Sequence, residues 1–271
     1  MVREIVEGSA EVVWQRGNDR RIDRIVRPLF AVRTQGARRG GSGNRTERRK
    51  NVSRQEQILP HGQVLRYTLR ERITHWAAGV TYLYLLGTGL AFWSPWLFWL
   101  AVALGGTQVS RTLHPWAGLI FFGSVWYMYV MWAPQMTHTD DDRRWWKALK
   151  YYSTNQDDKM PPAGRYNAGQ KFLFWGFFWA NLLLFLSGIF LWAPQYFAWH
   201  SLVAMRISVL VHAAAALFTI GLFMIHLYMG LFAERGAFGS VIRGDVSIAF
   251  AKRYHPAWYK EIAGEAASPR K

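Results

Sequence analysis

The sequence predicts an all-α membrane protein, a bundle of four transmembrane helices with both termini in the cytoplasm. Two observations predict this fold class. The chain of 271 residues contains four long apolar segments, although its mean hydropathy is close to zero. Because about 20 apolar residues in a helix cross a hydrocarbon core of roughly 30 Å, each segment is long enough to span a membrane. Lys and Arg residues, in turn, are concentrated in alternate connections between these segments, which is typical of multi-pass proteins.

The predicted helices are stretches that are nearly free of charged side chains. They are residues 73–93, 112–132, 172–192 and 206–232. The apolar piece 96–104 is too short to span a membrane and is predicted to be an interfacial segment or a helix extension. The charged loop that follows the second helix contains the stretch THTDDDRRWWKALK, which is typical of an amphipathic surface helix.

The distribution of basic residues orients these helices. Lys and Arg number 17 up to Arg72, one between the first and second helices, seven between the second and third, one between the third and fourth, and seven after the fourth. Because basic residues accumulate on the cytoplasmic side, both termini and the long middle loop are predicted to be cytoplasmic. Tryptophans cluster near the predicted outer ends, as in an aromatic belt: Trp93, Trp96, Trp99, Trp192 and Trp199.

Composition divides the chain into three parts. Residues 1–64 are basic and interrupted by Gly and Ser, and we expect a mostly disordered N-terminal extension without the apolar core of a secretory signal. Residues 65–232 form the predicted transmembrane domain. Residues 233–271 are again polar and basic and are predicted to be a cytoplasmic tail.

Charge and cysteine content exclude several classes of function. A net charge of +16 would suggest a nucleic-acid partner in a soluble protein, but the long apolar segments and 15 Trp residues favour a membrane surface instead. The chain has no cysteine, so it holds no disulfide or thiolate-ligated iron–sulphur cluster of its own. Any metal must be bound by histidine or carboxylate.

Histidines inside the apolar segments are the main functional signal. His212 and His226 both lie in the fourth segment, fourteen residues apart, which places them about 40° apart around a helix and about 21 Å apart along it. With the predicted topology, His114 shares the outer level with His212, and His75 shares the inner level with His226. Polar side chains at such depth are costly and usually functional.

Two level pairs of histidines on facing helices suit bis-histidine haem iron better than zinc or a di-iron site, which need more ligands or carboxylates. A small residue lies four positions after three of the ligands, where a flat macrocycle needs room: Gly79, Gly118 and Ala216. The competing interpretation is that each histidine is a satisfied interior residue. Four histidines at matched depths favour the ligand interpretation. The other histidines are expected to be solvated polar residues: His61, His138, His200 and His255.

The segment Tyr166–Gln170 lies directly before the third helix, at the level of the inner pair. Asn167, Gly169 and Gln170 supply hydrogen-bonding groups and close backbone approach for a ligand that carries carbonyl groups. Asn167 is equally suited to cap the helix. The residues alone leave both interpretations open.

Several motifs resemble the gamma subunit of membrane-bound respiratory formate dehydrogenases, a di-haem cytochrome b. They are RERITHWAAG, LHPWAG, YNAGQK, HAAAA with HLYMG, and GSVIRGDVSIAFAKRYHPAWYKEI, in order over about residues 65–262. The resemblance implies two b-type haems, an outer one on His114 and His212 and an inner one on His75 and His226. It also implies a quinone site beside the inner haem, formed by Asn167, Gly169, Gln170 and His226.

The implied function is electron transfer in a bacterial inner membrane. An iron–sulphur beta subunit and a molybdenum- or tungsten-containing alpha subunit, which oxidises formate, would be the partners. This chain would carry no catalytic residue for formate oxidation and would reduce menaquinone or ubiquinone at the cytoplasmic side. The outer basic residues Arg111 and Arg206 could pair with haem propionates or the partner. The alternatives are the cytochrome b of a hydrogenase or thiosulphate reductase, or a non-redox membrane scaffold or transporter.

Overall fold

A computed structural model describes residues 57–154, 156–197 and 201–264 of the chain. Residues 1–56, with most of the predicted N-terminal extension, lie outside the described part, as do Trp199 and His200. All that follows concerns the described residues.

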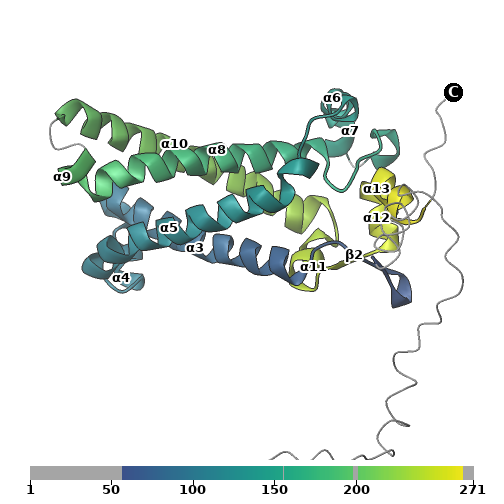
Figure 1. The fold of residues 1–271 in the computed structure, drawn as a ribbon, viewed down its shortest axis with the longest axis horizontal. Helices are drawn as coiled ribbons and strands as arrows, with labels where there is room; N and C mark the ends of the chain where they lie inside the picture. Colours follow the sequence, from purple (N-terminus) through teal and green to yellow (C-terminus); the bar gives the residue numbers. More distant parts are fainter. Residues whose placement is uncertain (1–56, 155, 198–200, 265–271) are drawn as a thin grey trace, which may run out of the picture. The chain divides into compact units, whose positions relative to one another are not determined.

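Four long helices run side by side (Figure 1). They are α3 (Leu69–Trp93), α5 (Thr107–Trp132), α8 (Ala168–Trp192) and α10 (Leu202–Tyr228). Helix α3 packs along α5, α8 along α10, and α5 along α8. Each predicted apolar segment coincides with one of these helices, although the helices start earlier than predicted and the last predicted segment continues beyond α10 to residue 232. At α3 and α8 the early start arises because the first turn contains polar side chains and is capped by Thr68 or Asn167.

The start of α3 illustrates this polar cap. Thr68 is the N-cap and accepts a hydrogen bond from the backbone N–H of Glu71, while the Glu71 carboxylate accepts the N–H of Thr68. Such a capping box satisfies N–H groups that have no partner inside the helix. Hydropathy alone therefore places the start of the helix too late.

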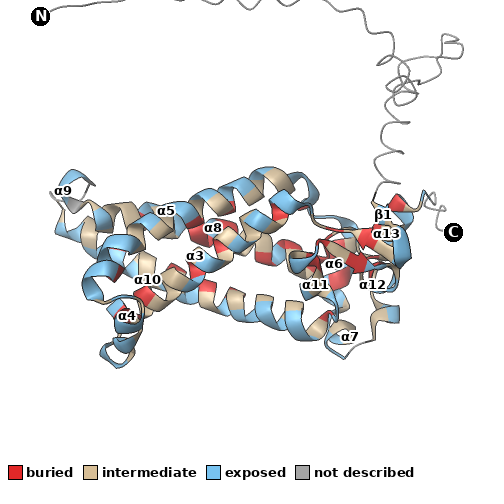
Figure 2. Cartoon of the chain, turned by 90° about the horizontal axis from the view of Figure 1, so that it is seen from below, coloured by how far each residue is buried: buried red, intermediate tan, exposed pale blue. Residues whose placement is uncertain are grey.

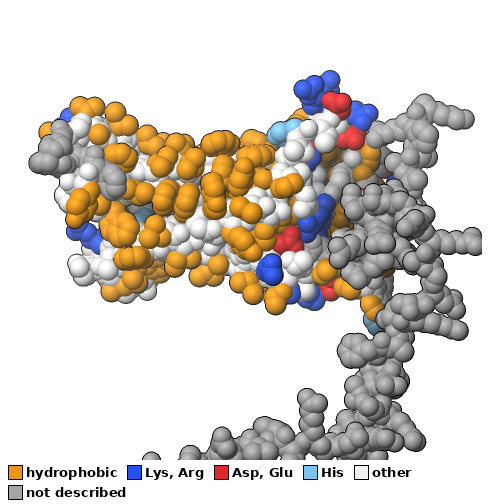
Figure 3. Space-filling model, viewed as in Figure 1, with side chains coloured by type: hydrophobic (Ala, Val, Ile, Leu, Met, Phe, Trp, Pro, Cys, Tyr) orange, Lys and Arg blue, Asp and Glu red, His pale blue; other side chains and the backbone are white. Residues whose placement is uncertain are grey.

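Within the described part of the chain, three helices are long and apolar enough to cross a membrane, namely Thr107–Gln135, Ala168–Trp192 and Leu202–Ala233. Most of their side chains are exposed or half-buried, as Figure 2 shows, and Figure 3 shows hydrophobic side chains over much of the visible flank of the helices. A helix that is apolar on all sides while its outer face is uncovered is typical of a membrane span. The protein is therefore a helical membrane protein. Helix α3 has 25 residues, with charged side chains in its first turn.

One end of the bundle carries short apolar elements. The 3₁₀ turn η3 (Pro95–Leu97) and helix α4 (Trp99–Ala103) connect α3 to α5, and α9 (Pro194–Phe197) follows α8. The residues 96–104 thus form a turn and a short helix, as predicted for a piece too short to span. Exposed tryptophans gather in these elements and the adjoining helix ends: Trp93, Trp96, Trp99 and Trp192.

The other end, here called the polar end, comprises the start of α3, the end of α5, the start of α8 and the end of α10. Three short elements follow α5 there: the 3₁₀ turn η4 (Ala133–Gln135) and helices α6 (Asp140–Lys147) and α7 (Leu149–Ser153). Helix α6 is the surface helix predicted from THTDDDRRWWKALK. The 3₁₀ turn η5 (Asp157–Lys159) leads back towards α8.

The C-terminal segment folds, whereas the sequence analysis predicted only a polar tail. A π turn, η6 (Met229–Ala233), ends α10 and is followed by α11 (Ala237–Ile242), strand β3 (Asp245–Ser247), α12 (Ile248–Tyr254) and α13 (Pro256–Ile262). Strand β3 pairs antiparallel with β2 (Gln63–Leu65), which pairs with β1 (Ile58–Leu59) across the 3₁₀ turn η2 (Pro60–Gly62). The apolar core of this layer consists of Val64, Val246, Phe250, Ala251, Trp258 and Ile262.

Gly244 joins this C-terminal layer to the start of α3. Its φ angle is +99°, and a Cβ atom there would lie 2.6 Å from the carbonyl oxygen of Tyr67. The backbone N–H groups of Arg66 and Tyr67 both donate to the carbonyl of Gly244. Only glycine permits both this backbone conformation and this close approach.

His255 corrects one prediction. The sequence analysis treated it as a solvated residue of the tail, but it is fully buried, and its Nδ1 lies 2.8 Å from the carbonyl oxygen of Gly164. Burial, together with the nearby Arg66 charge, lowers the pKa of His255 well below its ordinary value. The residue is therefore a neutral core histidine. His61 and His138 are exposed, as expected.

Candidate functional site

The structure brings His114 of α5 and His212 of α10 together. Their ring centroids are 6.4 Å apart, at the end of the bundle opposite the polar end. The two histidines come from helices far apart in the chain, so their proximity is a result of the bundle packing. This is the pair that the sequence analysis placed at the outer level.

A hydroxyl group from a neighbouring helix contacts each of these rings. Thr88 Oγ1 of α3 lies 2.7 Å from His114 Nδ1, and Ser187 Oγ of α8 lies 2.9 Å from His212 Nδ1. Both hydroxyls also lie within hydrogen-bond distance of the backbone carbonyl four residues earlier in their own helix, at 2.8 and 2.6 Å. A hydroxyl that donates to a carbonyl must accept from the imidazole, so Nδ1 carries the proton and the Nε2 lone pair is available for a metal.

Glycines follow these two hydroxyl residues. A Cβ atom at Gly89 would lie 3.8 Å from Cε1 of His114, and one at Gly188 would lie 3.3 Å from Cε1 of His212. Because these glycines have no side chain, the His114 imidazole can lie close to α3 and the His212 imidazole close to α8. The sequence analysis missed these residues, although the repeated hydroxyl–glycine pair in α3 and α8 was a detectable signal.

The second pair joins His75 of α3 to His226 of α10, with ring centroids 5.9 Å apart, towards the polar end. Trp76 packs edge-on against His75, and Phe177 of α8 packs edge-on against His226. The Nδ1 atom of His75 is buried and has no hydrogen-bond partner within the described part of the chain. These two histidines are the pair predicted for the inner level.

Both pairs fit a bis-histidine iron centre. Two metal–nitrogen bonds of about 2 Å each place the ligating nitrogens roughly 4 Å apart, which agrees with rings whose centroids are about 6 Å apart. Among the described residues, no group of three or more His, Cys, Asp or Glu side chains could hold a metal ion. A centre with two protein ligands therefore suits haem, whose macrocycle supplies the other nitrogens, better than zinc.

The predicted small residues leave the space that a macrocycle needs. A Cβ atom added at Gly79 or Gly118 would meet no atom within 4 Å, so the volume beside these turns is open. Ala216 is half-buried on α10, one turn after His212. The residues present fit haem at both pairs.

Asn167 has the capping role that the sequence analysis left open. It is the N-cap of α8: its Oδ1 accepts the backbone N–H of Gln170 at 2.9 Å, and Gln170 Oε1 accepts the N–H of Asn167 at 3.2 Å. Asn167 is 3% exposed. Gly169 lies against α6, because a Cβ atom there would be 3.1 Å from the ring of Trp145.

The amide nitrogens of this cap converge on Glu234, a residue that the sequence analysis missed. Asn167 Nδ2 donates to Glu234 Oε1 at 2.9 Å, and Gln170 Nε2 donates to Oε2 at 3.2 Å. The Tyr152 hydroxyl donates to Oε1 at 2.9 Å. Burial raises the pKa of Glu234, although the Arg66 charge and these hydrogen bonds oppose the rise. Burial beside this carboxyl group also raises the pKa of Tyr152.

Helix α8 links this cap to His226. Gln170 and Phe177 are seven residues apart, which places them on one face of the helix about 10 Å apart, and Phe177 contacts His226. Gln170 therefore lies at the polar end of a stripe that leads to the His75/His226 pair, with Asn167 and Gly169 beside it in the same turn.

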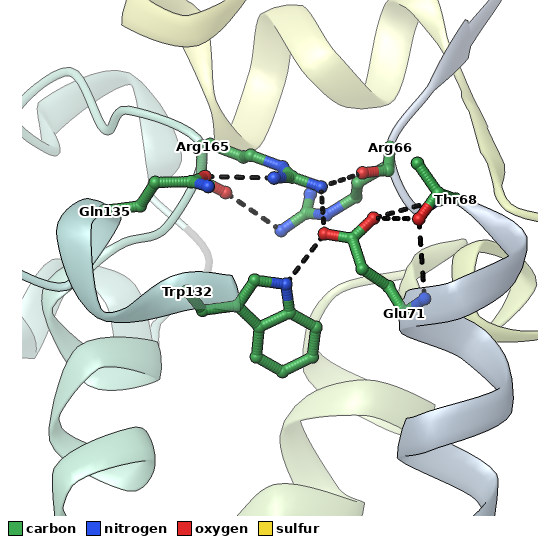
Figure 4. Close-up of polar contacts among 6 residues, drawn as sticks. All are labelled: Arg66, Thr68, Glu71, Trp132, Gln135 and Arg165. Atoms are coloured by element: carbon green, nitrogen blue, oxygen red, sulfur yellow. Dashed lines mark hydrogen bonds and ion pairs between the residues drawn. The ribbon is translucent and has the colours of Figure 1, made fainter. Parts of the chain in front are cut away.

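A second polar cluster ties together the ends of α3 and α5 and the loop before α8 (Figure 4). Glu71 Oε1 accepts hydrogen bonds from Trp132 Nε1 at 2.7 Å and from Arg165 Nη2 at 2.9 Å. Arg165 also donates to Gln135 Oε1 at 3.0 Å and to the backbone oxygen of Arg66. We call these contacts the Glu71 clasp. The sequence analysis did not predict these contacts, since isolated charged residues near helix ends are common and do not indicate which partner they will meet.

A buried ion pair joins α6 to α8. Lys171 Nζ lies 2.7 Å from Asp142 Oδ2 and donates to the carbonyl of Thr137 at 2.9 Å. Burial alone would raise the pKa of Asp142, but hydrogen bonds from Lys171 and Thr139 outweigh burial and lower it. This pair fixes the loop that precedes the Asn167 cap.

A cavity of about 1040 Å³ lies beside the Glu71 clasp. Its lining includes Arg66, Glu71, Ile73, Tyr127 and Tyr166, but not the predicted quinone residues. At the opposite end of the bundle, Arg111 and Arg206 are both exposed.

Comparison with known proteins finds relatives that cover most of the chain. The cytochrome b556(fdo) subunit of formate dehydrogenase from Escherichia coli strain K12 is 33% identical over 199 residues, which cover 73% of this chain and 93% of the relative. The nitrate-inducible cytochrome b556(Fdn) subunit from the same strain is 31% identical, covering 73% and 91%. The formate dehydrogenase cytochrome b556 subunit of Haemophilus influenzae is 30% identical, covering 73% and 83%. These relatives confirm the resemblance to formate dehydrogenase cytochromes.

The family match spans the whole bundle. Residues 66–244, from the start of the first long helix through the turn after α11, match the family described as prokaryotic cytochrome b561. This range contains both histidine pairs and the Asn167 cap. On this evidence the chain belongs to the prokaryotic cytochrome b561 family.

Proposed function

We propose that this chain is the membrane cytochrome b subunit of a formate dehydrogenase. It would pass electrons from the iron–sulphur clusters of a partner subunit, by way of two b-type haems, to a quinone. The observation that carries the proposal is the pair of histidine contacts, 6.4 and 5.9 Å between ring centroids, at two levels of one helical bundle. The names of the relatives supply the formate dehydrogenase assignment.

In this proposal α3 is the fourth membrane span. It is 25 residues long and packs along α5, and its charged first turn lies at the polar end with the other polar elements. Because Lys and Arg are concentrated in the segments at the polar end, this end faces the cytoplasm, as do both termini. The membrane is the bacterial inner membrane.

His114 and His212 hold the outer haem, and His75 and His226 hold the inner one. Haem b, when bound, supplies one-electron redox chemistry. The Thr88 and Ser187 hydroxyls orient the outer rings and keep Nε2 deprotonated for the iron. The proposal assigns Arg111 and Arg206, at the outer end, to haem propionates or the partner subunit.

The quinone is bound at the polar end. Asn167, Gly169 and Gln170 lie at the start of α8, on the helix whose Phe177 contacts the inner ligand His226. Amide N–H groups are suitable donors to a quinone carbonyl. Menaquinone and ubiquinone both carry this carbonyl chemistry. Protons for the reduced quinone would come from the cytoplasmic side.

The partners follow from the chain's own composition and its relatives. The chain has no cysteine, so iron–sulphur clusters must belong to another subunit. Formate oxidation, with its molybdenum or tungsten centre, is assigned to a further subunit. The alternative partners, a hydrogenase or a thiosulphate reductase, would use the same haem ligands.

A reduced-minus-oxidised visible spectrum of the purified chain tests the haem assignment. We expect a b-type absorption band and two haems per chain. A preparation without b-type absorption would contradict the whole proposal. In the purified complex, reduction of the haems by formate but not by hydrogen, and no reoxidation of the reduced haems by thiosulphate, tests the partner.

Asn167→Ala tests the quinone site. This variant should retain both haems and formate-driven haem reduction, and it should show a Kd for a quinone analogue about tenfold higher. Unchanged quinone affinity would remove Asn167 from the site.

A further inference from the structure

Glu234 is a buried carboxyl group that the proposed electron path does not use. It directly follows the π turn that ends α10, eight residues after His226, and is 2% exposed. Its two oxygens accept three hydrogen bonds from side chains of other elements: Asn167, Gln170 and Tyr152. A buried carboxyl group is costly unless it is hydrogen-bonded, so these contacts are needed to hold it there.

The contacts fix the orientation of both amides. The amide oxygens of Asn167 and Gln170 each accept a backbone N–H in the helix cap, and their nitrogens each donate to Glu234. Rotating either amide by half a turn would place its nitrogen against an N–H donor and its oxygen against the carboxyl group. Each amide nitrogen also carries a second N–H. Because the amide plane is fixed by these bonds, the direction of this second N–H is fixed as well.

A quinone carbonyl accepts hydrogen bonds and cannot donate them. A binding side chain must therefore offer its amide nitrogen, because an amide oxygen would repel the carbonyl. For Gln170 the helix cap alone favours this orientation weakly, since the bond that its Oε1 accepts from the Asn167 N–H is 3.2 Å long. The Glu234 carboxyl group accepts a hydrogen bond from each amide nitrogen and so strengthens this orientation.

We propose that Glu234 is a positioning residue of the quinone site, which holds the Asn167 and Gln170 amides so that both present an N–H to a quinone carbonyl. The inference rests on the quinone site proposed above. It adds a residue that contacts the binding side chains and not the quinone itself. It also links quinone affinity to the end of α10, the helix that carries one ligand of each haem.

The test uses the assembled complex, with decylubiquinone as the probe. Glu234→Gln keeps the size of the side chain but places an N–H donor against one of the two amide nitrogens. We expect the Kd of decylubiquinone in the oxidised complex to rise about tenfold, equivalent to ~1.4 kcal/mol. The KM for the quinone should rise with little change in kcat, while haem content, the visible spectrum and formate-driven haem reduction stay the same.

Tyr152→Phe is the matched control. It removes one donor to the same carboxyl group without touching either amide, and we expect the Kd to change by less than about twofold. Glu234→Asp provides a second variant if the Gln variant does not assemble. Its shorter side chain can reach only one amide, so its Kd should lie between those of the wild type and Glu234→Gln.

The outcomes separate this inference from the quinone site itself. If Asn167→Ala raises the Kd but an assembled Glu234 variant binds decylubiquinone like the wild type, the positioning role is wrong and the site stands. If Asn167→Ala has no effect, the proposed site fails first. A lower kcat with unchanged Kd in Glu234→Gln would indicate a proton carrier and would overturn the positioning role.

Discussion

The two histidine pairs share one ligand type and nearly one ring separation, but their surroundings differ. In the His114/His212 pair, each Nδ1 lies within hydrogen-bond distance of a hydroxyl from a neighbouring helix. In the His75/His226 pair, the rings pack edge-on against Trp76 and Phe177, and His75 Nδ1 has no partner in the described residues. The rings of the first pair are thus held by hydrogen bonds and those of the second pair mainly by aromatic packing.

The ends of the bundle around these pairs differ as well. The polar end holds the Glu71 clasp, the Lys171–Asp142 ion pair and the buried Glu234. Apolar turns and exposed tryptophans surround the outer pair. The two histidine pairs are thus supported by different means, and the denser polar network lies at the end where we propose the quinone site.

Replacement of a ligand is expected to have the largest effect. His114→Ala should remove the outer haem and leave the inner one, and His75→Ala should do the reverse, because each haem depends on its own pair. The haem-to-protein ratio should fall from two to about one in each variant. Pyridine haemochrome analysis measures the ratio, and His61→Ala, at an exposed position, is the control. Loss of both haems in each single variant would show that the two sites are not independent.

Breaking the Glu71 clasp should destabilise the polar end more than any exposed pair does. Glu71→Gln leaves Arg165 without its carboxylate, and we expect a loss of about 2 to 3 kcal/mol, seen as a lower apparent Tm of the complex in detergent. Arg144→Gln is the control, because its ion pair with Asp141 is more exposed and should contribute at most about 0.5 kcal/mol. Equal Tm shifts in the two variants would contradict the clasp.

Removing one supporting hydroxyl should sharpen the difference between the pairs. Thr88→Val deletes the contact to His114 Nδ1, and we expect haem affinity at the outer site to fall about tenfold while the inner site is unaffected. Thr81→Val is a matched control in the same helix, since Thr81 also bonds backbone carbonyls of the preceding turn. Haem retention during dilution or competition with apomyoglobin measures the affinity. A similar loss in both variants would mean that the hydroxyl acts on the helix and not on the ligand.

The smallest expected effect is on how the free energy of unfolding of the C-terminal layer depends on pH. Burial lowers the pKa of His255, so the folded state binds fewer protons than the unfolded state below the ordinary imidazole value of about 6.5. The stability of the C-terminal layer should therefore be complete above that pH and decrease as the pH falls below it, by at most about 1.4 kcal/mol per pH unit. Thermal unfolding at several pH values measures the slope, which His255→Gln should reduce. An unchanged slope in this variant would assign the pH dependence to other groups.

Much of the fold could be predicted because its signals are local. Apolar length predicts each long helix, and the helical period relates His212 to His226. The relatives confirm the resemblance that the sequence motifs indicated. The starts of α3 and α8 were placed too late, because a capping turn such as Thr68–Glu71 is polar and hydropathy does not detect it. The strand pairing of residues 63–65 with 245–247 was also missed, since two-to-three-residue strands have no detectable period.

The sequence by itself determined the kinds of side chain available at each level of the bundle: four histidines in apolar helices, no cysteine, and an amide-rich turn before α8. Only the tertiary structure decided which side chains touch. Thr88 meets His114, Ser187 meets His212, and Glu234 meets Asn167 and Gln170 across 25 to 67 residues of chain. A hydrogen bond requires heavy atoms within about 3 Å, and that distance depends on how the helices pack, not on the periodicity of any one of them. For the same reason His255 was predicted to be solvated, although the folded C-terminal layer buries it.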